Sequence, residues 1–244
     1  MIEFINVTKS YPNGDVVIDS LDLVVNPGDF IVITGKSGAG KTTIGRLLIK
    51  DLIPNKGKII FDGEDLAKIP PKKIPLLRRK IGFIFQDFKI IPDKTIGENI
   101  SIALEIAGFN PSKIQQKVTR LLEMVGLPKK ENLFPMQLAG GEIQRASIAR
   151  AIAADPQVLF ADEPTGNLDE QTSIEIFDLL KKINADGTTV IMSTHDVTLI
   201  DLHKARHITL QKGKIISDTG GKKKSPENTT KEKIDAKPES KTKK

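Results

Sequence analysis

The stretch GKSGAGKTT, residues 35–43, limits more than any other what this chain can fold into. It fits the pattern G-x-x-x-x-G-K-[ST], follows the apolar run FIVIT and opens a helical pattern, as a phosphate-binding loop requires. Glycines let the backbone turn tightly, so that its N–H groups and the helix N-terminus face a polyphosphate. Lys41 then reaches the β- and γ-phosphate oxygens, and Thr42 places a hydroxyl on Mg²⁺. We expect a nucleoside-triphosphate site here, with a plain glycine-rich turn as the alternative. The candidate cofactor-binding residues of this phosphate loop are Gly35, Lys36, Ser37, Gly38, Ala39, Gly40, Lys41, Thr42 and Thr43.

Short apolar runs alternate with helical patterns along the first 220 residues. Strand-like runs occur as FIVIT (30–34), KIIF (58–61), IGFIF (81–85), VLFA (158–161) and TVIMS (189–193), and HITL and KIIS predict a late hairpin. Two apolar stripes predict helices, one with Ile44, Leu47, Leu48 and Leu52, the other with Ile114, Val118, Leu121, Leu122 and Val125. This alternation predicts an α/β fold with a parallel sheet. Residues from about 87 to 155 hold no convincing strand, so we expect a helical subdomain inserted into an ATP-binding-type domain of residues 1–220.

Composition excludes several kinds of site. The 244 residues are 39% hydrophobic, enough for the core of one large α/β domain. With no cysteine and three histidines, the chain has no disulfide framework, no thiolate nucleophile and little for a metal cluster. No run of 18 uncharged apolar residues occurs, and the start, MIEFINVTKSYP, lacks an export signal. The sequence therefore predicts a protein that is neither exported nor membrane-spanning.

The positive charge lies in the last residues. Residues 221–244 carry nine lysines against four acidic residues, a net of +5 out of +6 for the whole chain. Since Ile234 is its one large apolar residue, this tail cannot bury enough surface to offset its ordering entropy, and we expect it to be disordered. It is either a solubilising terminus or an arm that contacts anionic lipid or nucleic acid. Because the rest of the chain is near neutral, the folded part is not expected to bind nucleic acid.

A second signal is VLFADEPTG, residues 158–166, where a buried run ends in two carboxylates. A charge at the end of a buried strand is costly unless it meets a cation or holds a water. Asp162 can hold Mg²⁺ through its water shell, and Glu163 can polarise the attacking water. An acidic pair in this position can also be an exposed turn or a helix cap, but the phosphate loop favours the catalytic interpretation.

Two adjacent glycines stand before an expected helix in QLAGGEIQR, residues 137–145. Alone, they fit a simple turn. Yet the order of phosphate loop, LAGGE and acidic pair resembles that of the ATP-binding cassette (ABC) ATPases over residues 1–216, where the signature is L-S-G-G-[QE]. The resemblance implies that two such domains pair head to tail, and that Gly140 and Gly141 approach the γ-phosphate bound by the partner. The next helix, expected over residues 142–154, then points its N-terminus at that anion.

Four more residues match positions of this family. The resemblance implies that Gln86, in FIFQD, senses Mg²⁺ and the attacking water and links the site to the helical subdomain. His195, in MSTHD, matches the switch histidine that contacts the γ-phosphate, and Asp169, in GNLD, matches the loop that crosses to the partner. Tyr11 matches the aromatic residue that stacks on adenine. For His195 and Tyr11 a purely structural role is the alternative.

Ala139 departs from the family pattern, because the signature has a serine whose hydroxyl reaches the γ-phosphate across the dimer. One hydrogen bond to a charged group contributes about 1.5–3 kcal/mol. We therefore expect a weaker ATP-bound dimer or slower turnover. ATP binding within one subunit should persist, since Lys41 and Thr42 remain.

The stretch IPLLRRKIGFIFQDFKII, residues 74–91, closely resembles the cell-division group of this family, and ADEPTGNLD is shared with relatives that power lipoprotein release and MacB-type export. The resemblance implies an ATPase with ATP and Mg²⁺ as cofactors and a homodimer in the ATP state. It also implies an FtsX-like integral membrane partner, which would place the chain in the cytoplasm on the inner face of the cell membrane. Phe88, Ile90 and Ile91 are candidates for docking that partner, or form an ordinary packing cluster.

The expected fold is a P-loop NTPase with a RecA-like α/β core, an antiparallel β arm near the N-terminus and an inserted helical subdomain. Two functional alternatives stay open. One is the ATPase of a lipoprotein-release or MacB-like exporter, and the other is an ATP-dependent clamp that hydrolyses very slowly because of Ala139.

Overall fold

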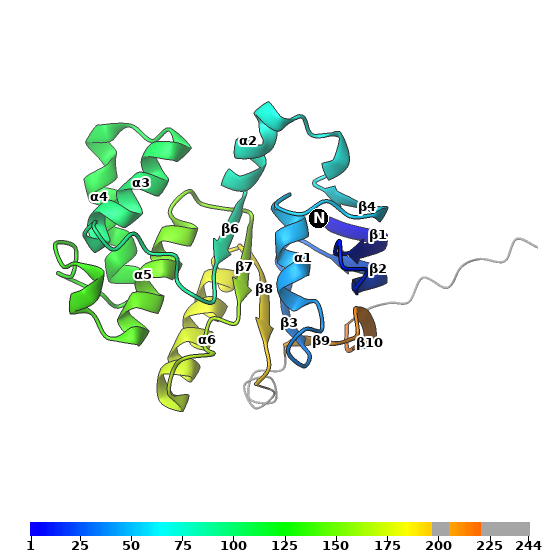
Figure 1. Ribbon diagram of the computed structural model, residues 1–244. Coiled ribbons are helices and arrows are strands. Elements are labelled where there is room, and N and C mark those ends of the chain that lie inside the picture. Colours follow the sequence, from blue (N-terminus) through cyan, green and yellow to red (C-terminus); the bar gives the residue numbers. More distant parts are fainter. Residues whose placement is uncertain (197–204, 221–244) are drawn as a thin grey trace, which may run out of the picture.

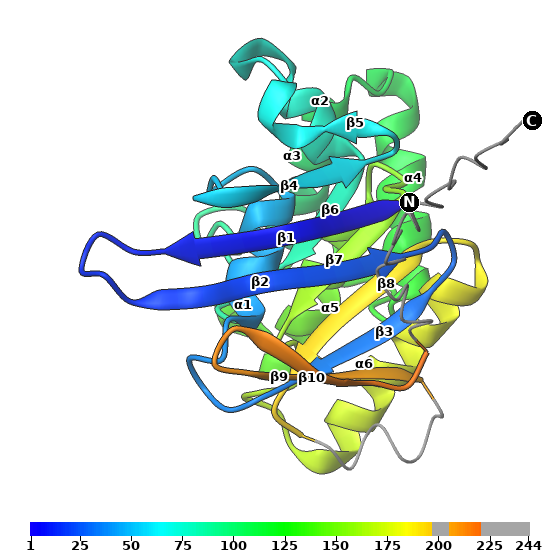
Figure 2. The ribbon, with the colours of Figure 1, turned by 90° about the vertical axis from the view of Figure 1, so that its right-hand side faces the viewer.

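Two β-sheets and their flanking helices form the fold in the computed structural model, which describes residues 1–196 and 205–220 (Figure 1). The lysine-rich tail expected at 221–244 lies outside the described residues. A second view shows the antiparallel strands β1, β2 and β4 lying across the strands of the larger sheet (Figure 2). Among the residues that the structure describes, no helix is both long and apolar enough to cross a membrane.

The larger sheet has six strands in the order β10-β9-β3-β8-β7-β6. Five of them are parallel: β3 (Phe30–Thr34), β6 (Ile81–Ile84), β7 (Val158–Asp162), β8 (Thr189–Thr194) and β9 (Arg206–Gln211). At the edge, β10 (Lys214–Asp218) pairs antiparallel with β9, which is the expected late hairpin. The predicted parallel α/β core is therefore confirmed. The carboxyl ends of β3, β7 and β8 meet at one edge, where ligands bind in open α/β sheets.

The smaller sheet is antiparallel, in the order β2-β1-β4-β5. Its strands are β1 (Ile2–Ser10), β2 (Val16–Val25), β4 (Lys56–Phe61) and β5 (Glu64–Asp65). It is the predicted antiparallel arm. The run KIIF at 58–61, grouped with the parallel strands from its sequence, belongs here instead, because β4 pairs antiparallel with β1. A short apolar run looks the same in both kinds of sheet.

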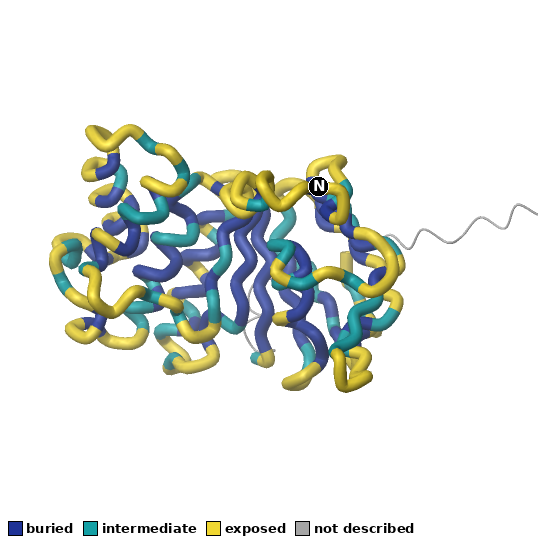
Figure 3. The backbone as a smooth tube through the Cα atoms, turned by 45° about the horizontal axis from the view of Figure 1, so that its top comes forward, coloured by how far each residue is buried: buried dark blue, intermediate teal, exposed yellow. Residues whose placement is uncertain are grey.

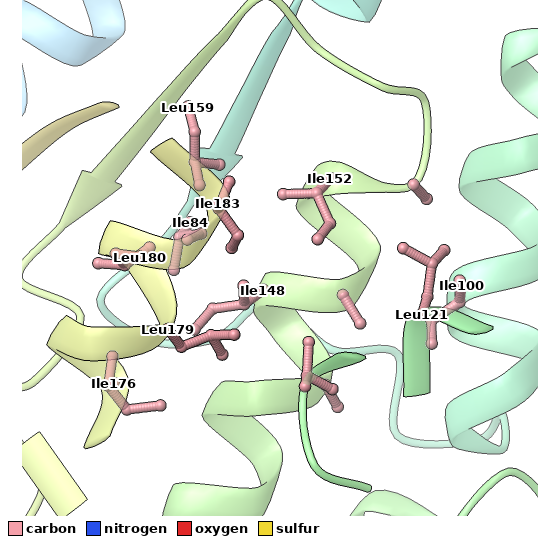
Figure 4. Close-up of a cluster of buried hydrophobic side chains, with 14 of the residues drawn as sticks. Ile84, Ile100, Leu121, Ile148, Ile152, Leu159, Ile176, Leu179, Leu180 and Ile183 are labelled. Carbon is pink, nitrogen blue, oxygen red and sulfur yellow. The ribbon is translucent and has the colours of Figure 1, made fainter. Parts of the chain in front are cut away.

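The parallel sheet separates two hydrophobic clusters. Along β3, Val32 packs into one cluster, while Ile31 and Ile33 pack into the other, because successive side chains of a strand point to opposite faces. The antiparallel sheet and α1 (Lys41–Leu48) cover the face of Ile31 and Ile33. On the opposite face, α5 (Gly140–Ile152) and α6 (Glu170–Ala185) pack on the sheet, and α3 (Ile96–Ala107) and α4 (Pro111–Met124) pack in turn on α5 (Figure 1). Buried strands between exposed loops are visible in Figure 3, and Figure 4 shows side chains of α5 and α6 in their cluster.

The described residues between β6 and β7, 85–157, form helices and loops and no strand. Local signals start these helices. Thr95 and Glu98 form a capping box at α3, and the Asn110 side chain caps α4 ahead of Pro111. Before β6, the chain forms η1 (Leu66–Lys68), η2 (Pro71–Lys73) and α2 (Ile74–Arg79), and η3 (Pro135–Gln137) precedes α5.

Two helix limits differ from those expected. The helix placed at 142–154 spans Gly140–Ile152, so both glycines lie in its first turn, after Ala139 in an extended conformation. The helix expected to include Leu52 ends at Leu48, because Lys50 adopts a left-handed φ of 54°. Leu52 still packs against the cluster beneath α1.

Candidate active site

The phosphate loop connects β3 to α1, so its end forms the N-terminus of that helix. Gly40, the residue before the helix, has a φ of 107°, and a Cβ there would lie 2.6 Å from Ile18 Cδ1 and 2.7 Å from the Val17 carbonyl oxygen. Only glycine adopts this left-handed φ without strain and also has no Cβ to clash with the two neighbours. Lys36, Ser37, Gly38 and Thr42 are exposed, Gly35 is partly exposed, and Ala39, Gly40, Lys41 and Thr43 are buried.

The Lys41 ammonium lies under the loop, where it is 4% exposed. Its Nζ donates to the Gly35 carbonyl at 2.7 Å and to the Lys36 carbonyl at 3.4 Å. It also lies 3.1 Å from Oε1 of Glu163. The cation of the phosphate loop is thereby paired with an acid that follows β7.

The acidic pair has two different environments. Asp162, the last residue of β7, is buried and accepts a hydrogen bond of 2.7 Å from Ser193 Oγ on β8. Glu163 has a left-handed φ of 46°, and its backbone N–H donates to the Ser193 carbonyl at 3.1 Å. Such strained backbone is commonly found at functional sites. Ser193 therefore positions both acids, and neither its residue type nor its spacing singled it out in the sequence.

His195 completes a chain of contacts. Its Nδ1 lies 3.2 Å from Glu163 Oε2, and its side chain is 61% exposed. The Glu163 carboxylate thus touches Lys41 with one oxygen and His195 with the other. The structure brings these three sequence-predicted residues together at the ends of β3, β7 and β8.

The signature residues, 138–142, lie at the start of α5, which packs on the face of the parallel sheet opposite to α1. Ala139 is the N-cap of α5, and its N–H donates to Glu142 Oε2 at 3.1 Å. This bond, followed by Lys130, lowers the pKa of Glu142. A Cβ on Gly140 would fit, in ordinary contact with Leu168 Cδ2 at 3.8 Å, whereas a Cβ on Gly141 would lie 2.6 Å from Thr172 Cγ2. Gly141 is therefore required for packing inside the subunit.

Asp169 lies close to this first turn of α5. Its carboxylate caps α6, accepting from the Thr172 N–H at 2.9 Å and the Thr172 hydroxyl at 2.6 Å, and these bonds lower its pKa. The N-termini of α5 and α6 therefore meet at Thr172, which sequence reasoning did not identify.

Among the described residues, no hydrogen bond or ion pair joins Gln86 or Tyr11 to Lys41, Glu163 or His195. Gln86 is exposed in a turn closed by a hydrogen bond from the Phe88 N–H to the Phe85 carbonyl. Tyr11 is partly buried in the turn between β1 and β2. Asp51, and more weakly Tyr11, raise the pKa of Arg46, which places the phenol near α1.

The donors at this edge of the sheet fit a magnesium nucleotide. Thr42 offers an exposed hydroxyl in the first turn of α1, and Asp162 offers a carboxylate at the end of β7. Mg²⁺ prefers such oxygen ligands and takes the rest from water and phosphate rather than from a cage of side chains. Accordingly, residues 1–196 and 205–220 contain no group of three or more His, Cys, Asp or Glu that could hold a metal ion by itself.

Comparisons with known proteins agree with this geometry. The ABC transporter family matches residues 18–166. The chain is 46% identical over 218 residues to the cell division ATP-binding protein FtsE of Bacillus subtilis, covering 89% of this chain and 96% of that protein. It is 42% identical over 220 residues to the protein of the same name from Escherichia coli, covering 90% and 99%. It also resembles the dimeric, post-hydrolysis structure of the ATP-binding cassette MJ0796 bound to ADP and Pi, with a TM-score of 0.81 and 32% identity, covering 89% and 97%.

Proposed function

This chain belongs to the ABC transporter family, in the group of cell-division ATP-binding proteins, and on that premise we propose how its residues bind and hydrolyse ATP. It is an ATPase subunit of a bacterial cell-division system. The contact of one carboxylate, Glu163, with both Lys41 and His195 carries the proposal for the site. This contact connects the carboxylate of Glu163, the phosphate-binding ammonium of Lys41 and the imidazole of His195.

Each of these residues has a separate task. Lys41 and the loop N–H groups bind the β- and γ-phosphates, and Thr42, Asp162 and Gln86 hold Mg²⁺. When bound, Mg²⁺ neutralises charge on the phosphates. Glu163 gives up its contact with Lys41, which then binds phosphate. Glu163 orients a water and accepts its proton as the water oxygen attacks the γ-phosphorus, while the bond from that phosphorus to the bridging oxygen breaks and ADP leaves. His195 contacts the γ-phosphate, and Tyr11 stacks on adenine.

The signature acts on the nucleotide of a second subunit. The buried side chains of α1 and α5 pack on opposite faces of the parallel sheet, so the first turn of α5 does not lie against its own phosphate loop. Ala139, Gly140 and Gly141 therefore need a second copy, arranged head to tail, in order to touch phosphate. Asp169 lies beside this turn and crosses to the partner with it. The MJ0796 cassette is reported as a dimer, which supports the pairing of two subunits.

The membrane partner is an FtsX-like integral membrane protein, and this chain binds it at the inner face of the cell membrane. A pocket of about 360 Å³ offers a place for one of its cytoplasmic segments. The pocket lies beside the Gln86 turn, and its lining is mostly apolar: Ile49, Asp51, Arg78, Ile81, Phe83 and Phe85. Phe88, Ile90 and Ile91 follow directly in the chain, and Ile91 is 39% exposed. The tail adds a weaker contact with anionic lipid.

Steady-state phosphate release by the full chain, alone and with the FtsX-like protein in lipid vesicles, tests this function. We expect Mg²⁺-dependent release that rises when the partner is present. ATP-dependent dimerisation with no release in either case would instead support the slow clamp. Truncation after Gly220 should leave release unchanged and weaken binding to anionic vesicles at low salt. Equal binding by both forms would assign the tail a solubilising role.

A further inference from the structure

The turn that carries Gln86 has a strained backbone. Phe88 and Lys89, which follow Gln86 by two and three residues, have left-handed φ angles of 59° and 49°. Residues with a Cβ rarely adopt this conformation, and two in succession need support from surrounding structure. The Phe88 N–H closes the turn through the Phe85 carbonyl at 3.1 Å. The position of Phe88 therefore determines that of Gln86.

Arg150 supplies the support from another element. Its Nη1 donates to the Lys89 carbonyl at 2.6 Å, and its Nη2 donates to the Phe88 carbonyl at 2.9 Å. Ser147, one turn earlier on α5, donates to the same Phe88 carbonyl at 3.3 Å. A planar guanidinium holds two adjacent carbonyl groups in a fixed orientation, which a lysine ammonium cannot do.

Within residues 1–196 and 205–220, the Arg150 side chain forms no hydrogen bond besides those to Phe88 and Lys89. Burial lowers its pKa, and among the described residues its guanidinium forms no ion pair with a carboxylate. A charged group partly removed from water is costly unless its donors are used. Here the guanidinium donors bond the carbonyl groups of Phe88 and Lys89, the two strained residues after Gln86.

Arg150 also connects this turn to the signature. It lies on α5, whose first turn contains Gly140 and Gly141. Ten residues of helix separate Gly140 from Arg150, about 15 Å along the axis. A shift of α5 when its N-terminus engages phosphate would therefore move the carbonyl groups that fix the Gln86 turn.

We infer that Arg150 is a positioning residue for hydrolysis, which holds the Gln86 turn and ties it to the signature helix. This inference rests on the proposed role of Gln86. Arg150 touches no substrate, so it should affect the rate of the chemical step and leave ATP binding unchanged.

The first test is Arg150→Met in the full chain, with binding of a fluorescent ATP analogue and single-turnover hydrolysis as measurements. We expect unchanged affinity and an about 10- to 100-fold slower chemical step, the size of effect that slight misplacement of a reacting group produces. Arg145→Met is the matched control, because Arg145 lies on the same helix and bonds the Val125 carbonyl and Glu175 instead of the turn. Equal loss of rate in both variants would overturn the inference.

A rescue separates positioning from general loss of structure. Glycine adopts a left-handed φ without strain, so Lys89→Gly should restore most of the rate lost in Arg150→Met. If Arg150→Met does not fold, Arg150→Lys serves instead, with a smaller loss that Lys89→Gly again reverses. Failure of the glycine to restore the rate in a folded variant would contradict the inference.

Combining Arg150→Met with Gln86→Ala tests two roles separately: that of Gln86 in hydrolysis and that of Arg150 in positioning Gln86. If Arg150 acts through Gln86, Arg150→Met should slow Gln86→Ala no further. A full additional loss would mean that Arg150 acts by another route. No loss in Gln86→Ala alone would reject the proposed role of Gln86, whereas a loss in Gln86→Ala without one in Arg150→Met would reject only the role of Arg150.

Discussion

Lys41 and Glu163 form an ion pair at the phosphate loop, with Nζ 3.1 Å from Oε1 and side chains 4% and 17% exposed. The same ammonium is the group that would bind the phosphate oxygens of ATP. The carboxylate and the nucleotide therefore compete for one cation. Glu163 has to leave Lys41 before it can orient a water.

Glu163→Gln should abolish turnover and also strengthen ATP binding. The amide cannot act as the base, but it competes less well for Lys41. Since a hydrogen bond between charged groups contributes about 1.5–3 kcal/mol, we expect ATP to bind about tenfold tighter, and about 150-fold tighter at most. Phosphate release and calorimetric titration with ATP measure the two effects. An ATP-closed dimer should accumulate.

Titration of the same variant with ADP provides the control, because ADP lacks the γ-phosphate. The gain in affinity should be smaller for ADP than for ATP. Undiminished phosphate release would contradict the assignment of Glu163 as the residue that activates the attacking water. Equal gains for both nucleotides would mean that the Lys41–Glu163 pair does not compete with the γ-phosphate.

The two signature glycines should respond differently to alanine. A Cβ on Gly140 would fit without a clash, because its nearest neighbour would be Leu168 Cδ2 at 3.8 Å, an ordinary contact distance. Gly140→Ala should therefore keep or raise stability, by up to about 1 kcal/mol for alanine over glycine in a helix. It should nevertheless weaken ATP-dependent dimerisation by blocking close approach of the partner's phosphate. Thermal unfolding and sedimentation with ATP measure the two quantities.

Gly141→Ala should destabilise the monomer itself, by about 1–3 kcal/mol as for other overpacked sites, because its Cβ meets Thr172 Cγ2. Thr172→Ser removes that methyl group and keeps the hydroxyl that bonds Asp169. The double variant should regain most of the lost stability in urea unfolding. Stability that Thr172→Ser does not restore would show that Gly141 is needed for another reason.

The sequence predicted those parts of the site that local pattern determines. The phosphate loop and the acidic pair each lie at the end of one strand, so composition and spacing suffice to find them. Ser193 and Thr172 could not be predicted, because each gains its role from a neighbouring element, β7 for Ser193 and the first turn of α5 for Thr172. The sequence also misplaces the N-terminus of α5, since glycine has a low helix propensity and Ala139 has no capping side chain.

Glu142 makes the stability of α5 depend on pH. The Ala139 N–H, and next Lys130, lower its pKa below the unfolded value of about 4.3. A lowered folded-state pKa stabilises the protein above that value, and the contribution is lost as pH falls through the folded pKa. Glu142→Gln should cost about 0.5 kcal/mol or less at pH 7, since the side chain is 32% exposed, and this cost should shrink as the pH falls below the unfolded pKa.

Urea unfolding of both forms from pH 3 to pH 7 measures this difference. Glu123→Gln, at an exposed position on α4, is the matched control for loss of one carboxylate. A gap for Glu142→Gln that stays constant over this range would contradict the electrostatic origin.

Ala139→Ser should change both the monomer and the dimer. Ala139 is the N-cap of α5 with an extended backbone, and Glu142 already bonds its N–H. A serine hydroxyl would accept from the Glu142 N–H and complete the capping box, which stabilises a helix by about 1 kcal/mol. The same hydroxyl would reach the partner's γ-phosphate, worth about 1.5–3 kcal/mol. We expect a higher melting temperature, unchanged ATP affinity in the monomer and stronger ATP-dependent dimerisation.

Ala139→Asp separates these two effects, because aspartate caps a helix as well as serine but opposes a phosphate by its charge. Both variants should melt higher than the wild type in the absence of nucleotide. In sedimentation with ATP, on a Glu163→Gln background that prevents hydrolysis, serine should strengthen the dimer and aspartate should weaken it. Dimerisation that rises equally in both would mean that helix stability, not contact with the partner's phosphate, limits closure. A rise in monomer ATP affinity for serine would place Ala139 beside its own nucleotide and contradict the head-to-tail arrangement.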